Sequence, residues 1–190
     1  APEVHAEAAP GPRVAVILGG KNAVYRFKDQ DDDRLAAALK SLGDLGASFM
    51  ITTSRRTHAR LLGVVEAATA GRPRIVYTGG GDNPYPEFLA HADALVVTAD
   101  SVNMTGEACA TGRPVYVFTP SGGSEKFRRF HQALRDHGAT RDLPECVDRI
   151  PEWHYAPLDS SREIAEEIER RYARRRAMLS GIMAADPAAG

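Results

Sequence analysis

The sequence predicts an α/β fold in which a mainly parallel sheet lies between two layers of helices. Short apolar runs alternate five times with stretches whose apolar residues recur at helical spacing. The apolar runs contain no polar alternation, which is typical of strands covered on both faces. Parallel strands joined through helices form right-handed crossovers. The expected architecture is therefore a Rossmann-like three-layer sandwich.

The expected strands and helices follow one another in order. The strands are Val14–Leu18, Phe49–Ile51, Ile75–Tyr77, Ala94–Val97 and Val115–Phe118. Helical stripes are marked by Leu35, Ala38, Leu39 and Leu42, by Leu61, Leu62, Val65 and Ala68, and by Phe127, Phe130, His131 and Leu134. The first of these helices ends at Gly43 or Gly46. Asn83 before Pro84 suits the start of a short helix, because proline in a first turn removes only an amide that has no partner there. A further helix is expected from Val102 to about Thr111.

The two ends of the chain lack this pattern. Residues 1–12 are rich in Ala and Pro and predict a linker or a cut terminus. Residues 13–180 are expected to form one domain, and 181–190 a flexible tail. Ser160 to Glu163 fits a capping box for a last helix. Five arginines within Arg170–Arg176 are interpreted as favourable charge at the end of that helix. Docking to an acidic partner or an anionic membrane surface is the less favoured alternative.

Composition excludes several classes of function. The 190 residues carry 24 Lys plus Arg and 25 Asp plus Glu, a net charge of −1, so a general polyanion binder such as a nucleic-acid protein is not expected. No apolar run approaches the roughly 18 residues that span a bilayer. Two cysteines and six histidines without ligand spacing predict neither a disulfide framework nor a metal site. With no signal peptide visible, a cytoplasmic protein is the simplest expectation.

The loops after the expected strands predict an anion site. Ligands of open parallel sheets bind outside the carboxyl ends of the strands. Glycines allow close approach of backbone amides, helix N-termini attract anions, and Arg and Lys add full charges. Glycine-rich turns after strands are also needed by any parallel sheet. The presence of Lys21, Arg55 and Arg56 on the same edge nevertheless favours an anion site. The expected nucleotide and phosphate contacts are Gly19, Gly20, Lys21, Ser54, Arg55, Arg56, Gly79, Gly80, Gly81, Asp82, Asn83 and Ser101.

The helix after the fourth expected strand carries a second feature. Asn103 and Glu107 are four residues apart and therefore share one helix face. A carboxylate here can accept hydrogen bonds from the two hydroxyls of a ribose. A solvated glutamate near a positive helix end is equally compatible with the spacing. By contrast, the P-loop, the Gly-x-Gly-x-x-Gly fingerprint and the Gly-x-Ser-x-Gly elbow are all absent. His131 and Cys109 are interpreted as packing residues.

Several motifs together resemble a known family. They are Gly19–Asn22, Thr53–Thr57, Tyr77–Tyr85, Ala99–Met104 and Pro157–Asp159. They are similar to a bacterial family of unknown function that is related to the plant mitochondrial fission factor "elongated mitochondria". Its members are often labelled predicted nucleoside-diphosphate-sugar epimerases. The resemblance covers about Arg13 to Tyr172 and implies that a further N-terminal domain precedes this chain. The family usually has Thr-Pro where this sequence has Thr57-His58.

The family in turn resembles the GT-B glycosyltransferase architecture, of which this chain would be the C-terminal domain. The resemblance implies the donor half of a metal-independent glycosyltransferase that uses a nucleoside diphosphate sugar and requires no cofactor. Glu107 matches the glutamate that holds the donor ribose in the lipid II-forming N-acetylglucosaminyltransferase. The implied partners are the nucleotide sugar and the N-terminal domain of the same protein, which would supply the general base. A catalytically silent adaptor and a GT-B-type sugar-nucleotide 2-epimerase remain alternatives.

Overall fold

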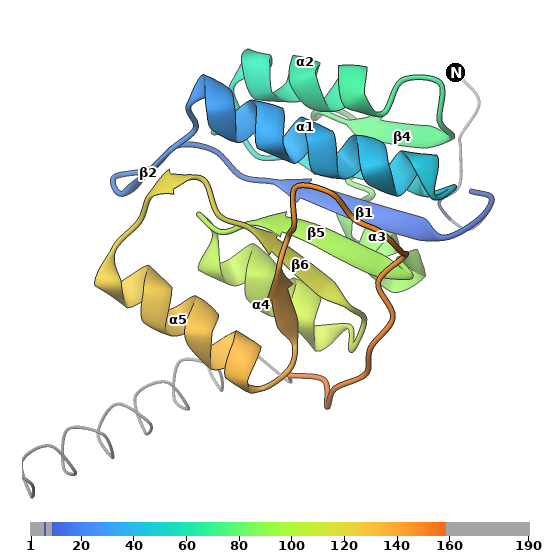
Figure 1. Ribbon diagram of the computed structural model, residues 1–190. Helices are drawn as coiled ribbons and strands as arrows, with labels where there is room; N and C mark the ends of the chain where they lie inside the picture. Colours follow the sequence, from blue (N-terminus) through green and yellow to red (C-terminus); the bar gives the residue numbers. More distant parts are fainter. Residues whose placement is uncertain (1–5, 7–8, 159–190) are drawn as a thin grey trace, which may run out of the picture.

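Six parallel strands form the centre of the computed structural model, which describes residue 6 and residues 9–158 (Figure 1). The sheet order is β4-β3-β1-β5-β6-β8. These strands are β1 Arg13–Leu18, β3 Ser48–Thr53, β4 Arg74–Tyr77, β5 Ala94–Thr98, β6 Val115–Phe118 and β8 Thr140–Asp142. The helices are α1 Asp29–Asp44, α2 Ala59–Ala68, α3 Tyr85–His91, α4 Val102–Ala110 and α5 Glu125–Asp136. A separate antiparallel ribbon pairs β2 Tyr25–Arg26 with β7 Ser121–Gly122.

The strand order reverses direction at β1. The chain first moves outward from β1 through β3 to β4 and then returns to place β5 on the other side of β1. In doubly wound sheets the crevice outside the carboxyl ends of the two strands at such a point is where ligands bind. The fold therefore places the loops that follow β1 and β5 next to each other at the most favourable position for a ligand.

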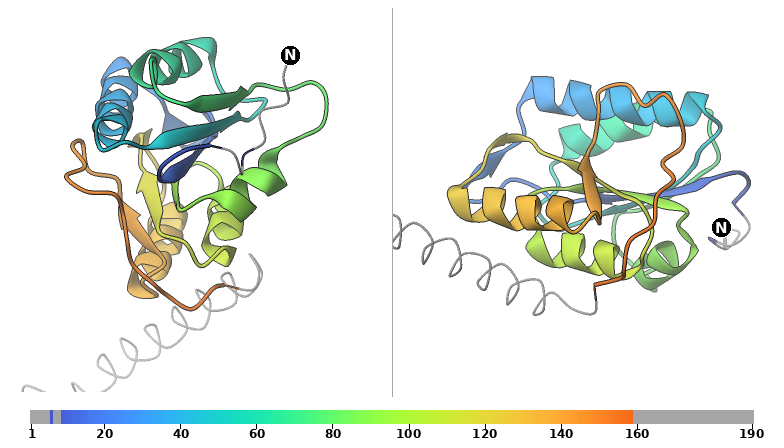
Figure 2. Two further views of the ribbon diagram at one scale, coloured as in Figure 1. Left: turned by 90° about the vertical axis from the view of Figure 1, so that its right-hand side faces the viewer. Right: turned by 60° about the horizontal axis from the view of Figure 1, so that its bottom comes forward.

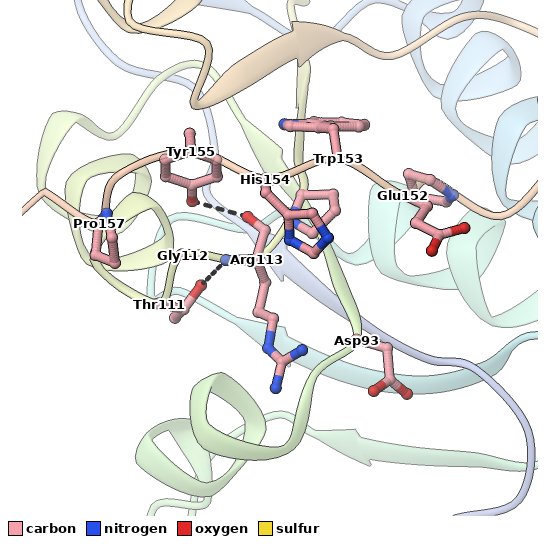
Figure 3. A pocket seen from close by; sticks show the side chains of 11 residues that line it. Asp93, Thr111, Gly112, Arg113, Glu152, Trp153, His154, Tyr155 and Pro157 are labelled. Atoms are coloured by element: carbon pink, nitrogen blue, oxygen red, sulfur yellow. Dashed lines mark hydrogen bonds between the residues drawn. The ribbon is translucent and has the colours of Figure 1, made fainter.

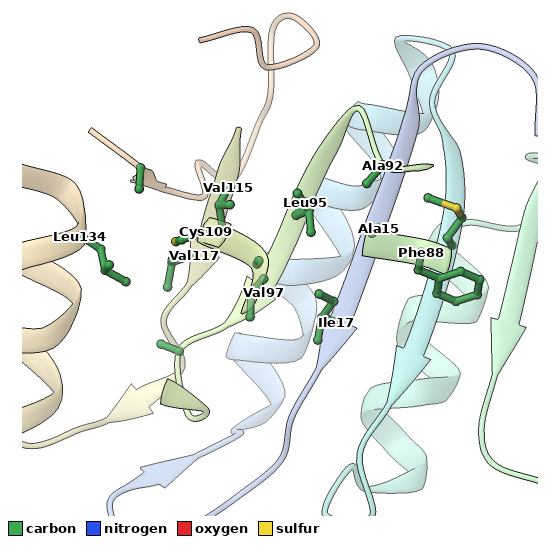
Figure 4. Close-up of a cluster of buried hydrophobic side chains, with 14 of the residues drawn as sticks. Ala15, Ile17, Phe88, Ala92, Leu95, Val97, Cys109, Val115, Val117 and Leu134 are labelled. Carbon is green, nitrogen blue, oxygen red and sulfur yellow. The ribbon is translucent and has the colours of Figure 1, made fainter. Parts of the chain in front are cut away.

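Helices cover both faces of the sheet (Figure 2). Leu35, Leu39 and Leu42 of α1 pack on one face together with α2, whereas Phe88 of α3 and Leu134 of α5 pack on the other with α4. Figure 4 shows how alternate strand side chains, such as Ala15 and Ile17, enter the second of these clusters. Each cluster consists of buried side chains with partly buried ones packed against them, so the sandwich has a core on each side of the sheet.

The expected Rossmann-like three-layer sandwich is confirmed, and so are the five strands and the helices between them. Of the two glycines at which α1 could end, Gly43 lies within the helix and Gly46 follows it. Gly46 has a positive φ of 91°, and its amide donates to the carbonyl of Gly43, which lies inside the helix. At the start of α2, His58 caps the helix, because its Nδ1 accepts the amide of Leu61 at 3.1 Å.

Three elements of the structure are not predicted by the apolar pattern of the sequence. The sixth strand, β8, is a polar Thr-Arg-Asp segment at the sheet edge, and the two strands of the β2–β7 ribbon have only two residues each. The third is a strap of residues 143–158, which crosses the edge of the sheet without regular structure (Figure 1). Its Val147 joins the core on the α1 side, and Trp153 packs edge to face on Tyr116. Local periodicity cannot detect elements this short.

Some expectations concern residues outside the described part of the chain, namely 1–5, 7–8 and 159–190. The capping box at Ser160, the Arg170–Arg176 run and the tail 181–190 lie there. Of the expected linker, Pro10 and Pro12 are described, and their carbonyls accept hydrogen bonds from the hydroxyl and amide of Ser48. Among the described residues, no helix has both the length and the apolar character needed to cross a membrane.

The packing of α1 predicts a clear difference between two adjacent positions. Leu39 is fully buried, whereas Lys40 is exposed. We expect Leu39→Ala to lower the free energy of unfolding by about 2–5 kcal/mol, because it removes buried apolar contacts and leaves a cavity. Lys40→Ala should change it by less than about 0.5 kcal/mol. Urea denaturation followed by circular dichroism measures both, and equal effects would contradict the packing described.

Candidate functional site

The loop after β1 is tied to the end of β5 at the carboxyl edge of the sheet. The amide of Gly19 donates to Thr98 Oγ1 at 2.7 Å, and the amide of Gly20 donates to Asp100 Oδ2 at 2.9 Å. Asn22 Nδ2 donates to the carbonyl of Asp100 at 3.1 Å. A Cβ on Gly19 would overlap the Asp100 carboxylate. The two loops at the point of strand reversal are therefore in direct contact, and this contact requires glycine.

The loop after β3 joins the same cluster. Arg56 donates from NH2 to Asp100 Oδ2 at 3.2 Å, and Thr57 Oγ1 donates to the carbonyl of Gly19 at 2.6 Å. A Cβ on Gly20 would overlap the carbonyl of Arg56. The amide and hydroxyl of Ser54 bond to Thr57 and fix the turn that carries Arg56. Three loops from three strands thus meet around one carboxylate.

The loop after β6 is attached through the ribbon. The amide of Gly123 donates to the carbonyl of Val24 at 2.7 Å. Asp31, at the start of α1, accepts the amides of Ser121 and Lys28 on its Oδ2, both at 3.0 Å. Its other oxygen accepts Arg34. Of the loops that follow β1, β3, β4, β5 and β6, all except the loop after β4 are therefore cross-linked by hydrogen bonds.

Asp100 is the most buried charged group of this cluster, with a side chain that is 0% exposed. Burial raises the pKa of Asp100, and it is opposed by the hydrogen bond from Gly20, by the Thr98 hydroxyl and by the charge of Arg56. Arg56 is 45% exposed, so the ion pair joins a buried anion to a cation at the surface. Such a carboxylate is stable only while its partners stay in place.

The N-terminus of α4 begins directly after Asp100. Ser101 caps it, since its Oγ accepts the amide of Met104 at 3.3 Å. Within the described residues, the amides of Val102 and Asn103 have no hydrogen-bond partner. They are unpaired first-turn donors of the kind that bind anions. A nine-residue helix thus presents its positive end beside the cluster.

Glu107 lies one turn further along α4 and is exposed. Its Oε2 accepts a hydrogen bond from the hydroxyl of Tyr85 at 2.7 Å, which links α4 to the first residue of α3. Burial raises the pKa of Tyr85, and the hydrogen bond and negative charge of Glu107 raise it further. Tyr85 therefore stays a protonated donor to Glu107 at neutral pH. The carboxylate is held in place rather than freely solvated.

The glycine-rich loop after β4 stands apart from the other four. Gly79, Gly80 and Gly81 have φ angles of 114°, 87° and 67°, and a Cβ on any of them would meet no atom within 4 Å. Asn83 Oδ1 accepts the amide of Tyr85 at 3.1 Å and so connects this loop to α3. The three glycines are exposed and have open space on the side where a Cβ would lie.

The structure therefore brings part of the predicted set together. Gly19, Gly20, Ser54, Arg56 and Ser101 lie around Asp100, whereas Gly79–Asp82 extend into solvent. Lys21 and Arg55 are exposed on the loops that carry Gly20 and Arg56. Asn103 and Glu107 lie on α4, as expected. Whether these residues bind a ligand stays a prediction. No group of three His, Cys, Asp or Glu side chains in the described part of the chain can hold a metal.

Sequence reasoning missed Asp100 and Tyr85. Asp100 directly precedes Ser101, one of the predicted phosphate contacts, and it is the first charged residue after the apolar run of β5. A carboxylate in that position is a usable signal, since aspartate is almost never fully buried without a partner. Tyr85 gave no signal by spacing, because its contact with Glu107 crosses 22 residues between two helices.

A cavity of about 420 Å³ lies at the opposite edge of the sheet (Figure 3). Asp93 and Pro114, which precede β5 and β6, form part of its wall, and Trp153 and His154 of the strap form another part. The hydroxyl of Tyr155 donates to the carbonyl of Arg113 at 2.8 Å and fixes the strap beside it. The cavity is at the amino ends of the strands, away from the predicted site.

Comparison with known sequences decides the family. The sequence matches the family described as mitochondrial fission ELM1 over residues 1–172. The chain belongs to this family. It is 34% identical over 169 residues to the mitochondrial fission protein ELM1 of Arabidopsis thaliana, a match that covers 88% of this chain and 40% of the relative. An uncharacterized protein of Rickettsia prowazekii is 30% identical over 161 residues, covering 82% and 45%.

The predicted family resemblance is therefore confirmed, and the chain spans less than half the length of these two relatives. Among solved structures, UDP-GlcNAc 2-epimerase from Neisseria meningitidis has a TM-score of 0.44 at 11% identity and covers 87% of this chain and 37% of its own. A family 9 glycosyl transferase from Veillonella parvula has a TM-score of 0.43 at 15% identity, covering 83% and 45%. Likenesses at this level assign no function.

His131 of α5 holds the backbone of Ala99, the residue directly before Asp100. It is 3% exposed, and its Nε2 donates to the carbonyl of Ala99 at 2.8 Å, which confirms its interpretation as a packing residue. Burial lowers the pKa of His131 from its ordinary value of 6.5, and Arg135 acts in the same direction. Cys109 is also buried in the core, as expected, and burial raises the pKa of its thiol to about 12.

His131 predicts a pH dependence of stability. Below pH 6.5 the unfolded chain takes up a proton at this position that the folded chain does not, so stability falls as the pH falls. The loss of stability at this position between pH 7.5 and 5.5 is at most about 1.4 kcal/mol, the value for a folded histidine that takes up no proton in this range. His131→Gln keeps a donor for Ala99 but cannot titrate. Urea denaturation at both pH values should give a smaller loss for the variant, and an equal loss would contradict the prediction.

The contact between the first two loops predicts opposite effects of alanine at two glycines. We expect Gly20→Ala to lower the free energy of unfolding by about 1–3 kcal/mol, because the added methyl group must displace the backbone of Arg56. Gly63→Ala is the matched control. Its Cβ would meet nothing within 4 Å inside α2, so it should stabilise by about 0.5–1 kcal/mol. Thermal denaturation distinguishes the two, and a neutral Gly20→Ala would show that the loops do not touch.

Proposed function

We propose that this chain is the donor-binding half of a GT-B-like glycosyltransferase and that it binds a nucleoside diphosphate sugar at the carboxyl edge of its sheet. The observation that carries the proposal is the position of Arg56. Its guanidinium is anchored on Asp100 beside Gly19 and Gly20, at the point where the strand order reverses. This is the place in the fold where anionic cofactors and substrates bind.

The diphosphate has complementary groups at this edge. The exposed part of the Arg56 guanidinium can donate two parallel hydrogen bonds to phosphate oxygens. The unpaired amides of Val102 and Asn103 add the positive end of α4. Lys21 and Arg55 are exposed on the neighbouring loops and add two further positive charges. Together they would neutralise a diphosphate without a metal ion.

The ribose would be held by Glu107. Tyr85 occupies Oε2 of this carboxylate and leaves Oε1 available, since no hydrogen bond to Oε1 exists among the described residues. A carboxylate oxygen accepts hydrogen bonds from vicinal hydroxyls, and Asn103 lies one turn before it on the same face. The ribose would then lie over α4 and the diphosphate over its N-terminus, in the order in which they are linked in a nucleotide.

In the reaction, an acceptor hydroxyl attacks the anomeric carbon while the bond to the diphosphate breaks. Arg56 and the α4 amides would stabilise the charge that develops on the leaving diphosphate, which is electrostatic catalysis by groups already in position. The general base and the acceptor site would belong to the rest of the longer protein, since relatives of this family are more than twice as long as this chain's match. This chain alone would bind the donor without turning it over.

A second function is favoured by the name of one relative, the mitochondrial fission protein ELM1. In that case the fold would be a catalytically silent adaptor, and the cross-linked loops would form a protein-docking surface. An adaptor needs neither the unpaired amides at α4 nor an available oxygen on Glu107. The two functions therefore differ in nucleotide binding, and a sugar-nucleotide 2-epimerase would differ again by converting the sugar without an acceptor.

Calorimetric titration tests the proposal. We expect one of UDP, GDP, ADP and CMP, or their sugars, to bind with a dissociation constant that Glu107→Ala raises about tenfold, because one charged hydrogen-bond acceptor is worth about 1.5 kcal/mol or more. Glu145→Ala, an exposed glutamate on the strap, is the matched control and should not change the affinity.

Silence of this chain and of the full-length protein toward all these ligands would contradict nucleotide binding. A partner protein that is captured by the wild type and lost with Glu107→Ala, in the absence of nucleotide binding, would favour the adaptor. Product analysis with the full-length protein distinguishes sugar transfer from epimerisation.

A further inference from the structure

The buried ion pair beneath the cross-linked loops suggests a role for Asp100 that extends the proposed function and rests on it. Asp100 cannot contact a ligand itself, because its side chain is 0% exposed and is covered by the backbone of Gly19. Its hydrogen-bond donors from neighbouring loops are the Gly20 amide and Arg56. Any effect of Asp100 on a ligand must therefore pass through these two groups.

Arg56 is held asymmetrically. Its NH2 group donates to Asp100 Oδ2 at 3.2 Å, and its other guanidinium groups have no partner among the described residues. The backbone of the same residue is fixed as well, because its amide donates to Ser54 Oγ at 3.2 Å and its carbonyl lies against Gly20. A planar guanidinium that is fixed on one side presents its remaining N–H groups in one defined direction.

The charges favour an outward orientation. A free arginine side chain on a loop samples many rotamers, and binding an anion must then order it. The carboxylate at its inner side removes this cost in advance, because a buried charge is stable only while its cation stays. It does not cancel the attraction for an anion at the outer side, where the guanidinium is closer to the ligand than the carboxylate is.

We propose that Asp100 is a positioning residue, which anchors Arg56 so that the outer side of its guanidinium is presented to the diphosphate of the bound ligand. The amide of Gly20 is fixed by the same oxygen, so one carboxylate aligns two of the three loops around the anion. Asp100 is thus the residue on which the arrangement of the cradle depends, although it never touches the ligand.

The experiment uses two conservative variants and inorganic pyrophosphate as the probe. Asp100→Asn keeps an acceptor for Gly20 but loses the charge that holds Arg56. Arg56→Lys keeps a cation for Asp100. A lysine ammonium that is paired with Asp100 lacks the second pair of N–H groups with which a guanidinium binds a phosphate. We expect each variant to weaken pyrophosphate binding at least tenfold in calorimetric titration. Both substitutions act through the guanidinium of Arg56. The double variant should therefore bind pyrophosphate no more weakly than the single variant that has the lower affinity.

Controls separate positioning from general damage. Asp93→Asn removes another aspartate–arginine pair, to Arg13, at the opposite edge of the sheet and should leave binding unchanged. Circular dichroism and urea denaturation check that each variant is folded. If Asp100→Asn does not fold, the Arg56 Nε–H resonance of the wild type decides. A signal that is already narrow before ligand is added supports anchoring by Asp100, and a signal that narrows only when pyrophosphate is added overturns it.

The outcomes distinguish the two proposals. Wild-type binding that is weakened in both single variants, with no further loss in the double variant, supports the positioning role. Wild-type binding that either folded variant retains in full overturns this role and leaves the proposed function standing. Additive losses in the double variant also overturn it, because Asp100 would then act by another route. No binding of pyrophosphate or nucleotides by the wild type overturns both.

Discussion

One buried carboxylate organises the carboxyl edge of this protein. Asp100 accepts the amide of Gly20 and the guanidinium of Arg56 on a single oxygen, and it lies at the point where the strand order reverses. A buried carboxylate without hydrogen-bond partners is strongly unfavourable. Loss of the Gly20 amide or of Arg56 from Asp100 is therefore costly. The loops after β1 and β3 cannot move from the end of β5 without breaking these contacts.

The rest of the edge is built outward from this point. Asn22 bonds to the carbonyl of Asp100 and also turns the chain into the β2 strand, because its Oδ1 accepts the amides of Val24 and Tyr25. The β2–β7 ribbon then carries the constraint to the loop after β6. On the other side, the capped N-terminus of α4 follows Asp100 directly. A rigid arrangement of backbone donors and cations results, which is what preorganised anion binding requires.

The fold was largely predictable from the sequence, and the reason is the apolar pattern. Runs such as Val14–Leu18 lack polar alternation because helices cover both faces of the sheet and bury every side chain of the strand. The cation-bearing loops were also predictable, since topology places them on one edge. The key role of Asp100 was not, because it depends on a contact with Arg56 over 44 residues. The isolation of the Gly79–Gly81 loop was likewise invisible, because glycine content does not reveal whether a loop packs on its neighbours.

Membership in the ELM1 family places a name that concerns mitochondrial fission beside the proposed diphosphate site at the carboxyl edge of the sheet. The most direct test of the proposed site is nuclear magnetic resonance of this chain during titration with inorganic pyrophosphate. The account predicts that the Gly20 amide and the Arg56 Nε–H signal shift together and saturate at one ligand concentration, while the amide of Gly63 in α2 stays unchanged. Shifts that are absent at Gly20 and Arg56, or that appear only elsewhere, would contradict it.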